Sequence, residues 1–470
     1  MQTYRRESER LKNTVSDVEK TFPRLGVNKK QEIIRLLYEI SKKENTLPSS
    51  IIKDMDSIDF NTAKQRLLRR RFPNSYINNE ISRTYLPKLR LDKKSCLDIK
   101  NKRFYPETIF IEKAAQGSRL AERFRKSFPQ ASFSEIKSLK DYLKTHRNTT
   151  VSDYNKRRGT AFITYENYDF FKTCPCTKKA IGCGYNIFNL SFGCIFECTF
   201  CYLQEYTNSP GIIFPANIDN FFREFSSYKR KGMRIGTGEF SDSLMLDNIT
   251  EYSLPIVEFF RKHPDVLFEF KTKSVNIENL LKIDHSGNIV IAWSLNPQSI
   301  IDENEFLSTS LLQRISAAKK CSQAGYRLAF HFDPVIYFDG WKKEYKKVVD
   351  LVFSSVKPND IAWISIGTLR FNPKVKQVIE DRFPGNKILD QELLPDFDNK
   401  LRYPAALRQN IYKAMLEMLS RHSKKLPVYL CMESSSMWKK VRPLWPSGAL
   451  QDIYSGRCHT QHKALGQHMA

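Results

Sequence analysis

Short apolar segments alternate with amphipathic segments through the middle of this chain of 470 residues. The apolar segments have the length and composition of buried strands, and six of them lie at residues 185–191, 233–237, 267–272, 288–294, 327–332 and 361–366. The segments between them place apolar residues at helical spacing, as residues 310–325 do. Strands that alternate with helices in this way form a parallel sheet. The pattern therefore predicts an α/β fold, most simply a partial (βα)6 barrel.

A chain of this length exceeds what one hydrophobic core usually supports, so we expect further parts around the barrel. Residues 27–44 carry a stripe of apolar side chains at helical spacing, which predicts an amphipathic helix. The predicted parts are a basic helical extension at 1–100, a βα lead-in at 101–160, the barrel at 161–400, and a C-terminal helical segment with an irregular tail at 401–470.

The chain carries a formal net charge of +25, and its basic residues are unevenly placed. Residues 1–160 hold 37 Lys and Arg against 19 Asp and Glu, so +18 of the +25 lies in the first third. A field of this sign attracts polyanions such as nucleic acids and makes their binding depend on salt. A solvated basic face without a partner is the alternative. Within residues 61–75, helix packing and phosphate contact are both open for Lys64, Arg66, Arg69, Arg70 and Arg71.

We expect a cytoplasmic protein without a membrane partner. No segment approaches the roughly 18 uninterrupted apolar residues of a membrane span, and the first 14 residues lack the apolar core of a signal peptide. The ten cysteines are too few and too clustered for a secreted disulfide scaffold. Clustered thiols in a reducing compartment favour metal binding.

One short segment, GCIFECTFCYLQ, places Cys194, Cys198 and Cys201 directly after the first predicted strand, in the spacing Cys-x3-Cys-x2-Cys. In βα barrels the chemistry lies in the loops after the strands. Three thiolates can ligate three irons of a four-iron cluster and leave the fourth open, whereas electron-transfer clusters take four cysteines. This is the arrangement of radical S-adenosylmethionine (SAM) enzymes, in which the open iron binds SAM. A structural zinc site with a fourth ligand is the alternative.

Other cysteines and histidines are weaker ligand candidates. Cys174, Cys176 and Cys183 could form a second metal site, shield the cluster or be ordinary thiols, and we favour a structural role. In the tail, chance explains the metal-like group better than function does; it consists of Cys458, His459 and His462.

The chain resembles the spore photoproduct lyase family, radical SAM enzymes that reverse a thymine-thymine adduct in DNA. The resemblance spans residues 103–415 and is carried by RFYPETIFIE, CGYNIFNLSFGCIFECTFCYLQ, IAWSLN, RISAAKKCSQAGYRLAFHFDPVIYFDGW and LRFNPKVKQVIEDRFP. It implies a radical SAM barrel, a 4Fe-4S cluster on the three cysteines, and SAM as cofactor. The first 100 residues lie outside it.

The resemblance also implies contacts to SAM. Lys271 and Ser294 match positions that contact the cofactor, and Ser241 and Asp242 match a loop beside it. Glu239 resembles the acidic position that holds the SAM amino group, and a carboxylate suits an ammonium. A salt bridge between Lys271 and Glu239 at the barrel rim is the alternative.

Two further roles follow from the resemblance. Tyr202 matches a tyrosine that relays the radical, although it could simply pack over the cluster. Arg402 and Tyr403 resemble a pair that wedges into DNA at the lesion, where base extrusion exposes a hidden atom.

The chain departs from the family at two positions. Glu239 stands where proven lyases carry a cysteine that donates a hydrogen atom to the product radical, and a carboxylate has no weak X-H bond to give. Phe200 stands where a second tyrosine is expected between the last two cluster cysteines. These departures bear on the thymine-adduct reaction and leave the radical SAM assignment intact.

We therefore expect a radical SAM lyase that acts on a pyrimidine photolesion in DNA and takes its electron from a donor such as a flavodoxin or ferredoxin. One alternative is a radical SAM enzyme that modifies another nucleic acid such as RNA. Another is a non-catalytic, metal-stabilised nucleic-acid-binding protein. The basic first third favours a nucleic acid without choosing among these.

Overall fold

The computed structural model describes residues 2–98, 103–146, 150–166, 171–177, 179–207, 209–230 and 232–441. The chain divides into two compact units. The smaller unit combines residues 1–100 with 199–206 and 369–408, and the larger unit contains the ranges 101–198, 207–368 and 409–470. The metal-like group of the tail, Cys458, His459 and His462, lies outside the described residues.

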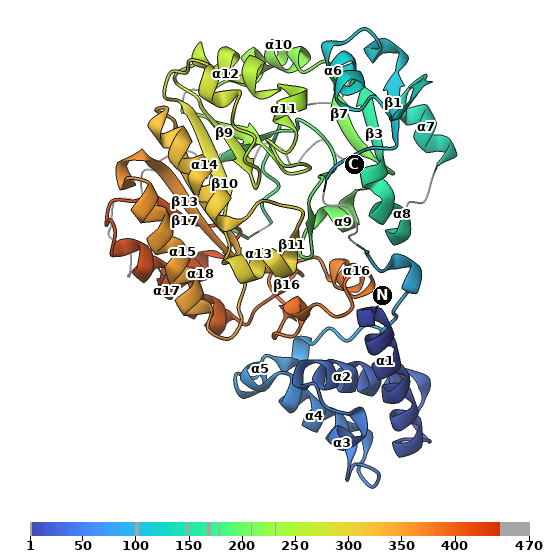
Figure 1. The fold of residues 1–470 in the computed structure, drawn as a ribbon. Coiled ribbons are helices and arrows are strands. Elements are labelled where there is room, and N and C mark those ends of the chain that lie inside the picture. The colour runs from blue at the N-terminus through green and yellow to red at the C-terminus, as the bar shows by residue number, and fades with distance from the viewer. Residues whose placement is uncertain are drawn as a thin grey trace. The chain divides into compact units, whose positions relative to one another are not determined.

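An eight-stranded sheet forms the centre of the larger unit, in the order β17-β13-β12-β10-β9-β8-β5-β4. Its inner strands are the six that the sequence predicts: β5 Tyr185–Phe188, β8 Arg234–Thr237, β9 Leu267–Thr272, β10 Ile289–Ser294, β12 Arg327–Val335 and β13 Ile361–Thr368. Neighbours among these six pair in parallel. Figure 1 shows the sheet curving as a partial barrel, so the predicted fold is confirmed.

Two strands of three residues extend the sheet at its edges and were not predicted. β17 (Val428–Leu430) pairs in parallel with β13, and β4 (Phe171–Thr173) pairs antiparallel with β5. A bridge between Ala180 and Ser434 joins the loops that follow these two edge strands. Strands this short carry too little alternation for a sequence pattern to find them.

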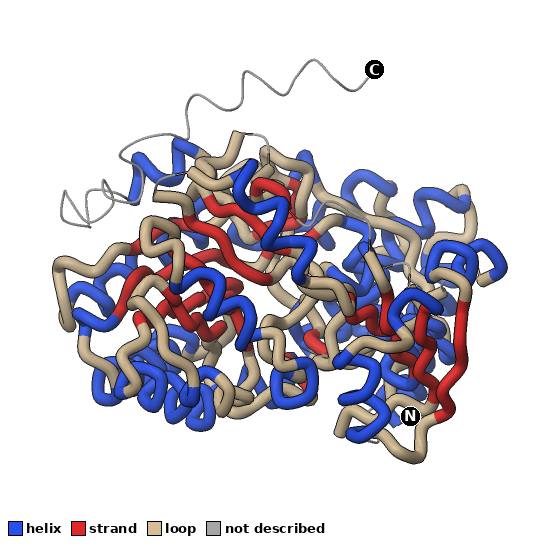
Figure 2. The backbone as a smooth tube through the Cα atoms, turned by 90° about the horizontal axis from the view of Figure 1, so that it is seen from above, coloured by secondary structure: helices blue, strands red, loops and turns tan. Residues whose placement is uncertain are grey.

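Helices line the outer side of this sheet, as Figure 2 shows. The helices that accompany this sheet along the chain are α10 Asp219–Tyr228, α11 Asp247–Thr250, α12 Ser253–Arg261, α13 Gln298–Asn304, α14 Leu311–Gln323, α15 Trp341–Ser355, α17 Ala405–Ser420 and α18 Ser435–Val441. Aromatic side chains fill the layer between helices and strands. The rings of Phe171 and Phe221 stack at 4.2 Å, and those of Phe260 and Phe268 lie 4.3 Å apart. Burial of such large apolar groups is the main source of stability for a layered fold.

A second, four-stranded parallel sheet belongs to the same unit, in the order β2-β1-β3-β7. Its strands are β1 Thr108–Glu112, β2 Ser132–Ile136, β3 Thr160–Thr164 and β7 Ile212–Pro215, with helices α6 Arg119–Ser127, α7 Leu139–Thr145 and α8 Val151–Lys156. The predicted lead-in contained β1, α6 and β2, and these are confirmed. Strands β3 and β7 were not predicted. The lead-in therefore forms only part of this sheet, and its last strand, β7, comes after the cysteine loop in the chain.

The smaller unit is built on the N-terminal helices α1 Gln2–Thr21, α2 Val27–Glu44, α3 Pro48–Ile52, α4 Phe60–Arg71 and α5 Pro73–Ile77. The predicted helix at 27–44 is confirmed as α2. Apolar side chains from these helices form one core that includes Val18, Leu37 and Leu67. Leu394, far along the chain, packs into the same core. The smaller unit also contains α9 Leu203–Tyr206, α16 Pro373–Arg382 and a small sheet of β14 Arg370–Phe371, β16 Leu401–Arg402 and β15 Leu394–Pro395.

The basic segment of α4 divides between packing and exposure. Three of its five basic residues pair with carboxylates of α2: Lys64 with Glu32 at 2.6 Å, Arg70 with Glu44 at 2.5 Å, and Arg71 with Glu39 at 2.8 Å. Arg66 and Arg69 are exposed. Ion pairs with α2 therefore engage three of these side chains, of which Arg70 is still exposed, and the other two face the solvent.

Within the described part of the chain, no helix combines the length and the apolar character needed to cross a membrane.

Candidate active site at the cysteine loop

The loop that carries the first two motif cysteines begins after β5 and ends in the short strand β6 (Glu197–Cys198). This two-residue strand pairs antiparallel with β11 (Glu305–Phe306), and the register sets Cys198 opposite Glu305. Cys198 is buried, and Cys194 is partly buried. The loop thus follows the C-terminal end of a sheet strand, where βα barrels carry their chemistry.

A partly buried lysine lies beside the second cysteine. Lys273 Nζ donates to Cys198 Sγ at 3.5 Å and pairs with Glu305 Oε1 at 3.2 Å. Arg314 Nη2 pairs with the other oxygen of Glu305 at 2.8 Å, and neither side chain of this pair is exposed. Burial alone would raise the pKa of Glu305, but Lys273 and Arg314 lower it to about 2. The carboxylate therefore stays ionised and holds the Lys273 ammonium next to the thiol.

Lys273 was not predicted from the sequence. The predicted residue was Lys271, two positions earlier, whose backbone N–H donates to Ser243 Oγ at 3.0 Å at the end of β9. Lys273 directly follows the predicted strand at 267–272, and this position was the signal that could have pointed to it, because a strand end is where a barrel delivers side chains to its site.

An arginine from the lead-in holds the backbone of the cysteine loop. Arg157 Nη2 donates to the carbonyls of Cys194 and Phe196, at 3.2 Å each. Its Nη1 pairs with Glu197 at 2.7 Å, and both side chains are at most 2% exposed. The guanidinium also lies over the ring of Tyr154, 4.0 Å from the centroid. Arg157 thus holds the cysteine loop through hydrogen bonds and an ion pair. The sequence did not indicate that the region before β3 supports this loop.

The loop after β8 is tied to the end of β9 by Asp242. One carboxylate oxygen accepts from Thr272 Oγ1 at 2.6 Å, and the other accepts from the backbone N–H of Lys273 at 2.6 Å. Burial raises the pKa of Asp242, while these hydrogen bonds lower it, and the net direction is upward. Ser241 precedes this anchored residue. Ser294 ends β10 and is buried, and its carbonyl accepts from Arg314 Nη1 at 2.8 Å.

Glu239 has a positive φ of 152° and follows Gly238, whose φ is 116°. Its carboxylate pairs with Lys172 of β4 at 2.5 Å, and Lys172 also lies over the ring of Phe240 at 4.5 Å. The partner that the structure gives Glu239 is therefore Lys172 and not Lys271. Phe240 immediately precedes Ser241, and neither Glu239 nor Phe240 carries a weak X-H bond.

Cys201 and Tyr202 belong to the segment that groups with the smaller unit. Tyr202 is 39% exposed, and its ring meets that of Tyr206 edge-on at 5.7 Å. Phe200, at the position where the resemblance predicts a tyrosine, is buried. Gln204, in the short helix that follows, donates to the carbonyl of Thr199 at 2.8 Å and so closes the turn around the third cysteine.

Arg402 and Tyr403 are buried in the smaller unit. Arg402 is 1% exposed, and its guanidinium pairs with Asp398 through two hydrogen bonds of 3.0 and 2.5 Å. Tyr403 is not exposed, and its carbonyl accepts from Arg408. A wedge role in DNA would require both side chains to leave these positions, so that role stays a prediction.

The upstream cysteines gather with a later one. Cys176 Sγ lies 3.8 Å from Cys174 Sγ. Hydrogen bonding to Cys176 and burial raise the pKa of Cys174, and Cys431 and Cys183 raise it further. Cys174 and Cys176 follow β4 at one edge of the large sheet, and Cys431 follows β17 at the other. The bridge between Ala180 and Ser434 joins the loops at these two edges. The choice among a metal site, a shield and ordinary thiols stays open.

No group of three His, Cys, Asp or Glu side chains is preassembled for a metal ion among the residues with described positions. The three thiol ligands nevertheless fit a four-iron cluster in which one iron has no protein ligand. Three thiols come from eight consecutive residues. A partly buried lysine accompanies Cys198, and a buried arginine donates to the carbonyl of Cys194. Thiolate ligands need such compensation, because a cluster carries net negative charge into a buried site.

Comparison with known proteins places the chain beside one group. The family described as spore photoproduct lyase matches residues 104–402. A spore photoproduct lyase of Geobacillus sp. is 25% identical over 298 residues, which cover 61% of this chain and 85% of that protein. The Bacillus subtilis protein of the same name is 25% identical over 309 residues, which cover 62% and 86%.

Solved structures give the same group. A cysteine-to-serine mutant of spore photoproduct lyase superposes with a TM-score of 0.60 at 22% identity, covering 70% of this chain and 99% of that one. A spore photoproduct lyase complexed with dinucleoside spore photoproduct superposes with a TM-score of 0.58, with the same identity and coverage. At this identity the structural likeness speaks for the fold.

Proposed function

The chain belongs to the spore photoproduct lyase family, and from that premise we propose that it is a radical SAM lyase that repairs a pyrimidine photolesion in DNA. As a family member it is a radical SAM enzyme that works with a 4Fe-4S cluster and SAM. The observation that carries the proposal is the three-cysteine loop after β5, backed by Lys273 at Cys198 and by Arg157 at Cys194.

We assign the cluster to Cys194, Cys198 and Cys201, and SAM to the strand ends that carry Glu239, Ser241, Lys271 and Ser294. When bound, the cluster and SAM supply a 5′-deoxyadenosyl radical. The residues of the chain do the rest. Arg157 fixes the loop backbone, and Lys273 holds positive charge beside a ligand sulfur. Asp242 ties the loop after β8 to β9 and so fixes the rim of the site.

Two observations support a nucleic acid substrate. The first third of the chain holds +18 of the +25 net charge, and Arg66 and Arg69 of α4 are exposed. A structure of a family member contains dinucleoside spore photoproduct. We propose DNA as the partner on this basis. The absence of a donor cysteine at Glu239 and Phe240 favours one second candidate, a radical SAM enzyme that modifies another nucleic acid such as RNA.

The reaction needs one electron per SAM cleaved, and we propose that a flavodoxin or ferredoxin supplies it. A basic enzyme surface suits such a partner, because these electron carriers are acidic. The cytoplasm, a reducing compartment, is the proposed location.

The test begins with anaerobic reconstitution of the full chain with iron and sulfide. We expect one four-iron cluster per chain and release of 5′-deoxyadenosine from SAM under reduction. The variant with Cys194, Cys198 and Cys201 all changed to Ala should lose both. A full cluster and continued SAM cleavage in that variant would overturn the site assignment.

Product analysis then separates the substrates. Incubation with UV-irradiated DNA should restore thymine from its adduct. Release of 5′-deoxyadenosine without any decrease of the adduct would favour the second candidate. A protein that holds metal but releases no 5′-deoxyadenosine would be the non-catalytic alternative.

A further inference from the structure

Buried ion pairs join helix α2 of the N-terminal extension to the segment that contains α16. Glu39 of α2 accepts from Lys376 of α16 at 2.7 Å and pairs with Arg71 of α4 at 2.8 Å. Arg35, one turn earlier on α2 and not exposed, pairs with Glu380 of α16. Opposite charges at this depth must be paired, because an unpaired one would keep its full desolvation cost.

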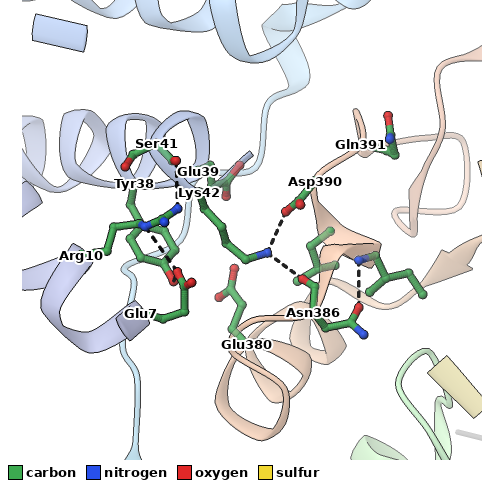
Figure 3. Close-up of polar contacts among 12 residues, drawn as sticks. Glu7, Arg10, Tyr38, Glu39, Ser41, Lys42, Glu380, Asn386, Asp390 and Gln391 are labelled. Atoms are coloured by element: carbon green, nitrogen blue, oxygen red, sulfur yellow. Dashed lines mark hydrogen bonds and ion pairs between the residues drawn. The ribbon is translucent and has the colours of Figure 1, made fainter. Parts of the chain in front are cut away.

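A second contact lies beyond the end of α16. Figure 3 shows Lys42 reaching from α2 to the side chain of Asp390 and to the carbonyl of Asn386. These bonds measure 2.7 and 2.6 Å, and both charged side chains are at most 15% exposed. Helix α2 is therefore fixed to residues 376–390 at several points.

The C-terminal end of α16 contacts the loop of the third cysteine. Arg382, 1% exposed, donates from Nη1 to Gln204 Oε1 at 2.8 Å. Gln204 in turn donates to the carbonyl of Thr199 at 2.8 Å, so its amide spans the turn that contains Cys201 and Tyr202. The backbone N–H of Leu97, at the end of the extension, donates to the carbonyl of Arg382 at 3.0 Å.

One helix of ten residues thus receives the extension on one side and supports the cysteine loop at its end. We propose that the N-terminal helices position the turn that carries Cys201 and Tyr202, and that Glu39 is a positioning residue acting through α16 and Arg382. Residues 1–100 precede the family match at 104–402, so this support is an addition of this chain to the family fold. The inference rests on the proposed role of the loop as the cluster site.

The test compares two full-length variants by hydrogen exchange and by spectroscopy of the reconstituted cluster. Glu39→Gln leaves Lys376 without its carboxylate, whereas Arg70→Gln removes an exposed ion pair of the same extension that does not involve α16. In Glu39→Gln we expect amide exchange in residues 199–206 to speed up by about tenfold or more. The electron paramagnetic resonance signal of the reduced cluster should broaden, because the third ligand is less firmly placed. Arg70→Gln should leave both readouts as in the parent protein.

A milder variant covers the case in which Glu39→Gln does not fold. Lys42→Ala removes a partly exposed ion pair to the same segment and should accelerate exchange in residues 199–206 by a smaller factor. Unchanged exchange in 199–206 in a folded variant, with faster exchange in residues 376–382, would overturn the inference. Neither readout uses a lesion or turnover, so a protein that fails to repair DNA contradicts the proposed function and leaves this result standing.

Discussion

Arg157 and Glu197 form an ion pair of 2.7 Å in which both side chains are almost fully buried, directly behind the carbonyl of Cys194. A pair at this depth is costly to break, because the partner left behind keeps its desolvation cost, about 3–5 kcal/mol in comparable cases. Arg157 also donates to two loop carbonyls, which would be left without this donor if the arginine were removed. The pair therefore makes the conformation of the cysteine loop depend on the lead-in region.

We predict that Arg157→Leu lowers the iron content of the reconstituted protein, even when the variant is assayed well below its melting temperature. Both loop carbonyls are left without their donor, and Glu197 is left without its cation. Lys156→Ala, an exposed neighbour, serves as the control and should retain the cluster. Full iron content and an unchanged cluster spectrum in Arg157→Leu would show that the loop holds its shape without this arginine.

A second prediction concerns Lys273. A cation and hydrogen-bond donor at a ligand sulfur stabilises the more negative, reduced form of a cluster. Lys273→Met should therefore shift the cluster reduction potential to more negative values, by on the order of 50 mV. Arg314 still compensates Glu305 in this variant, so the buried carboxylate is not left alone. Lys282→Met, at an exposed lysine nearby in the sequence, is the control. A redox titration that gives equal potentials for both variants would exclude Lys273 from tuning the cluster.

The barrel could be predicted from the sequence because its signals are local. The strand at 267–272 and the helix at 27–44 have the bounds that periodicity predicted. The cysteine motif was also recognisable, since all three thiols come from one short segment. Arg157 was not, because it stands 37 residues before Cys194 and meets it only through the fold. Lys376 and Glu39 are 337 residues apart, so no pattern along the chain could join the extension to α16.

The basic surface gives a third prediction. Each phosphate that a variant no longer neutralises in a DNA complex reduces the slope of log affinity against log salt by about 0.9. Arg66→Gln with Arg69→Gln should weaken binding to UV-irradiated duplex DNA and reduce that slope by about 2 if both side chains bind phosphates.

Deletion of residues 1–100 is a poor test, because Leu394 and the ion pairs of residues 376–390 would be left without their partners. Arg261→Gln with Lys262→Gln, at two exposed residues of the larger unit, is the control. Equal salt slopes for the two double variants would mean that α4 does not bind DNA.

The buried carboxylate of Glu39 gives a pH prediction. Burial alone would raise its pKa, but Lys376, Arg71 and Arg35 hold the pKa well below its ordinary value of 4.5. Because the folded-state pKa lies below the unfolded one, the unfolded chain takes up a proton first as the pH falls. The stabilisation is therefore fully present above pH 4.5 and is lost as the pH drops below it. Urea unfolding at about pH 6 and about pH 3 should show this loss in the parent protein, and a smaller one in Glu39→Gln. An equal loss in the two proteins would assign the acid sensitivity to other carboxylates.

The last prediction concerns the hydrogen atom that a lyase must return to its product radical. Glu239 forms an ion pair with Lys172, and Phe240 has no weak X-H bond, so neither position supplies the thiol donor that the resemblance predicts there. Tyr202 follows Cys201, the third proposed cluster ligand, and its side chain is 39% exposed, so its phenol is accessible to the solvent. A phenolic O–H is a far better hydrogen-atom donor than a carboxylic acid. We expect Tyr202→Phe to keep SAM cleavage at the parent rate while clean repair falls at least tenfold and abortive adducts accumulate. Tyr206→Phe is the control. The ring of Tyr206 lies 5.7 Å from that of Tyr202, and loss of its hydroxyl should leave product formation normal. Mass spectrometry of the DNA products separates the two variants. Repair by Tyr202→Phe at the parent rate would remove this tyrosine from the pathway and turn the search for the donor to the thiols near Cys174 and Cys431.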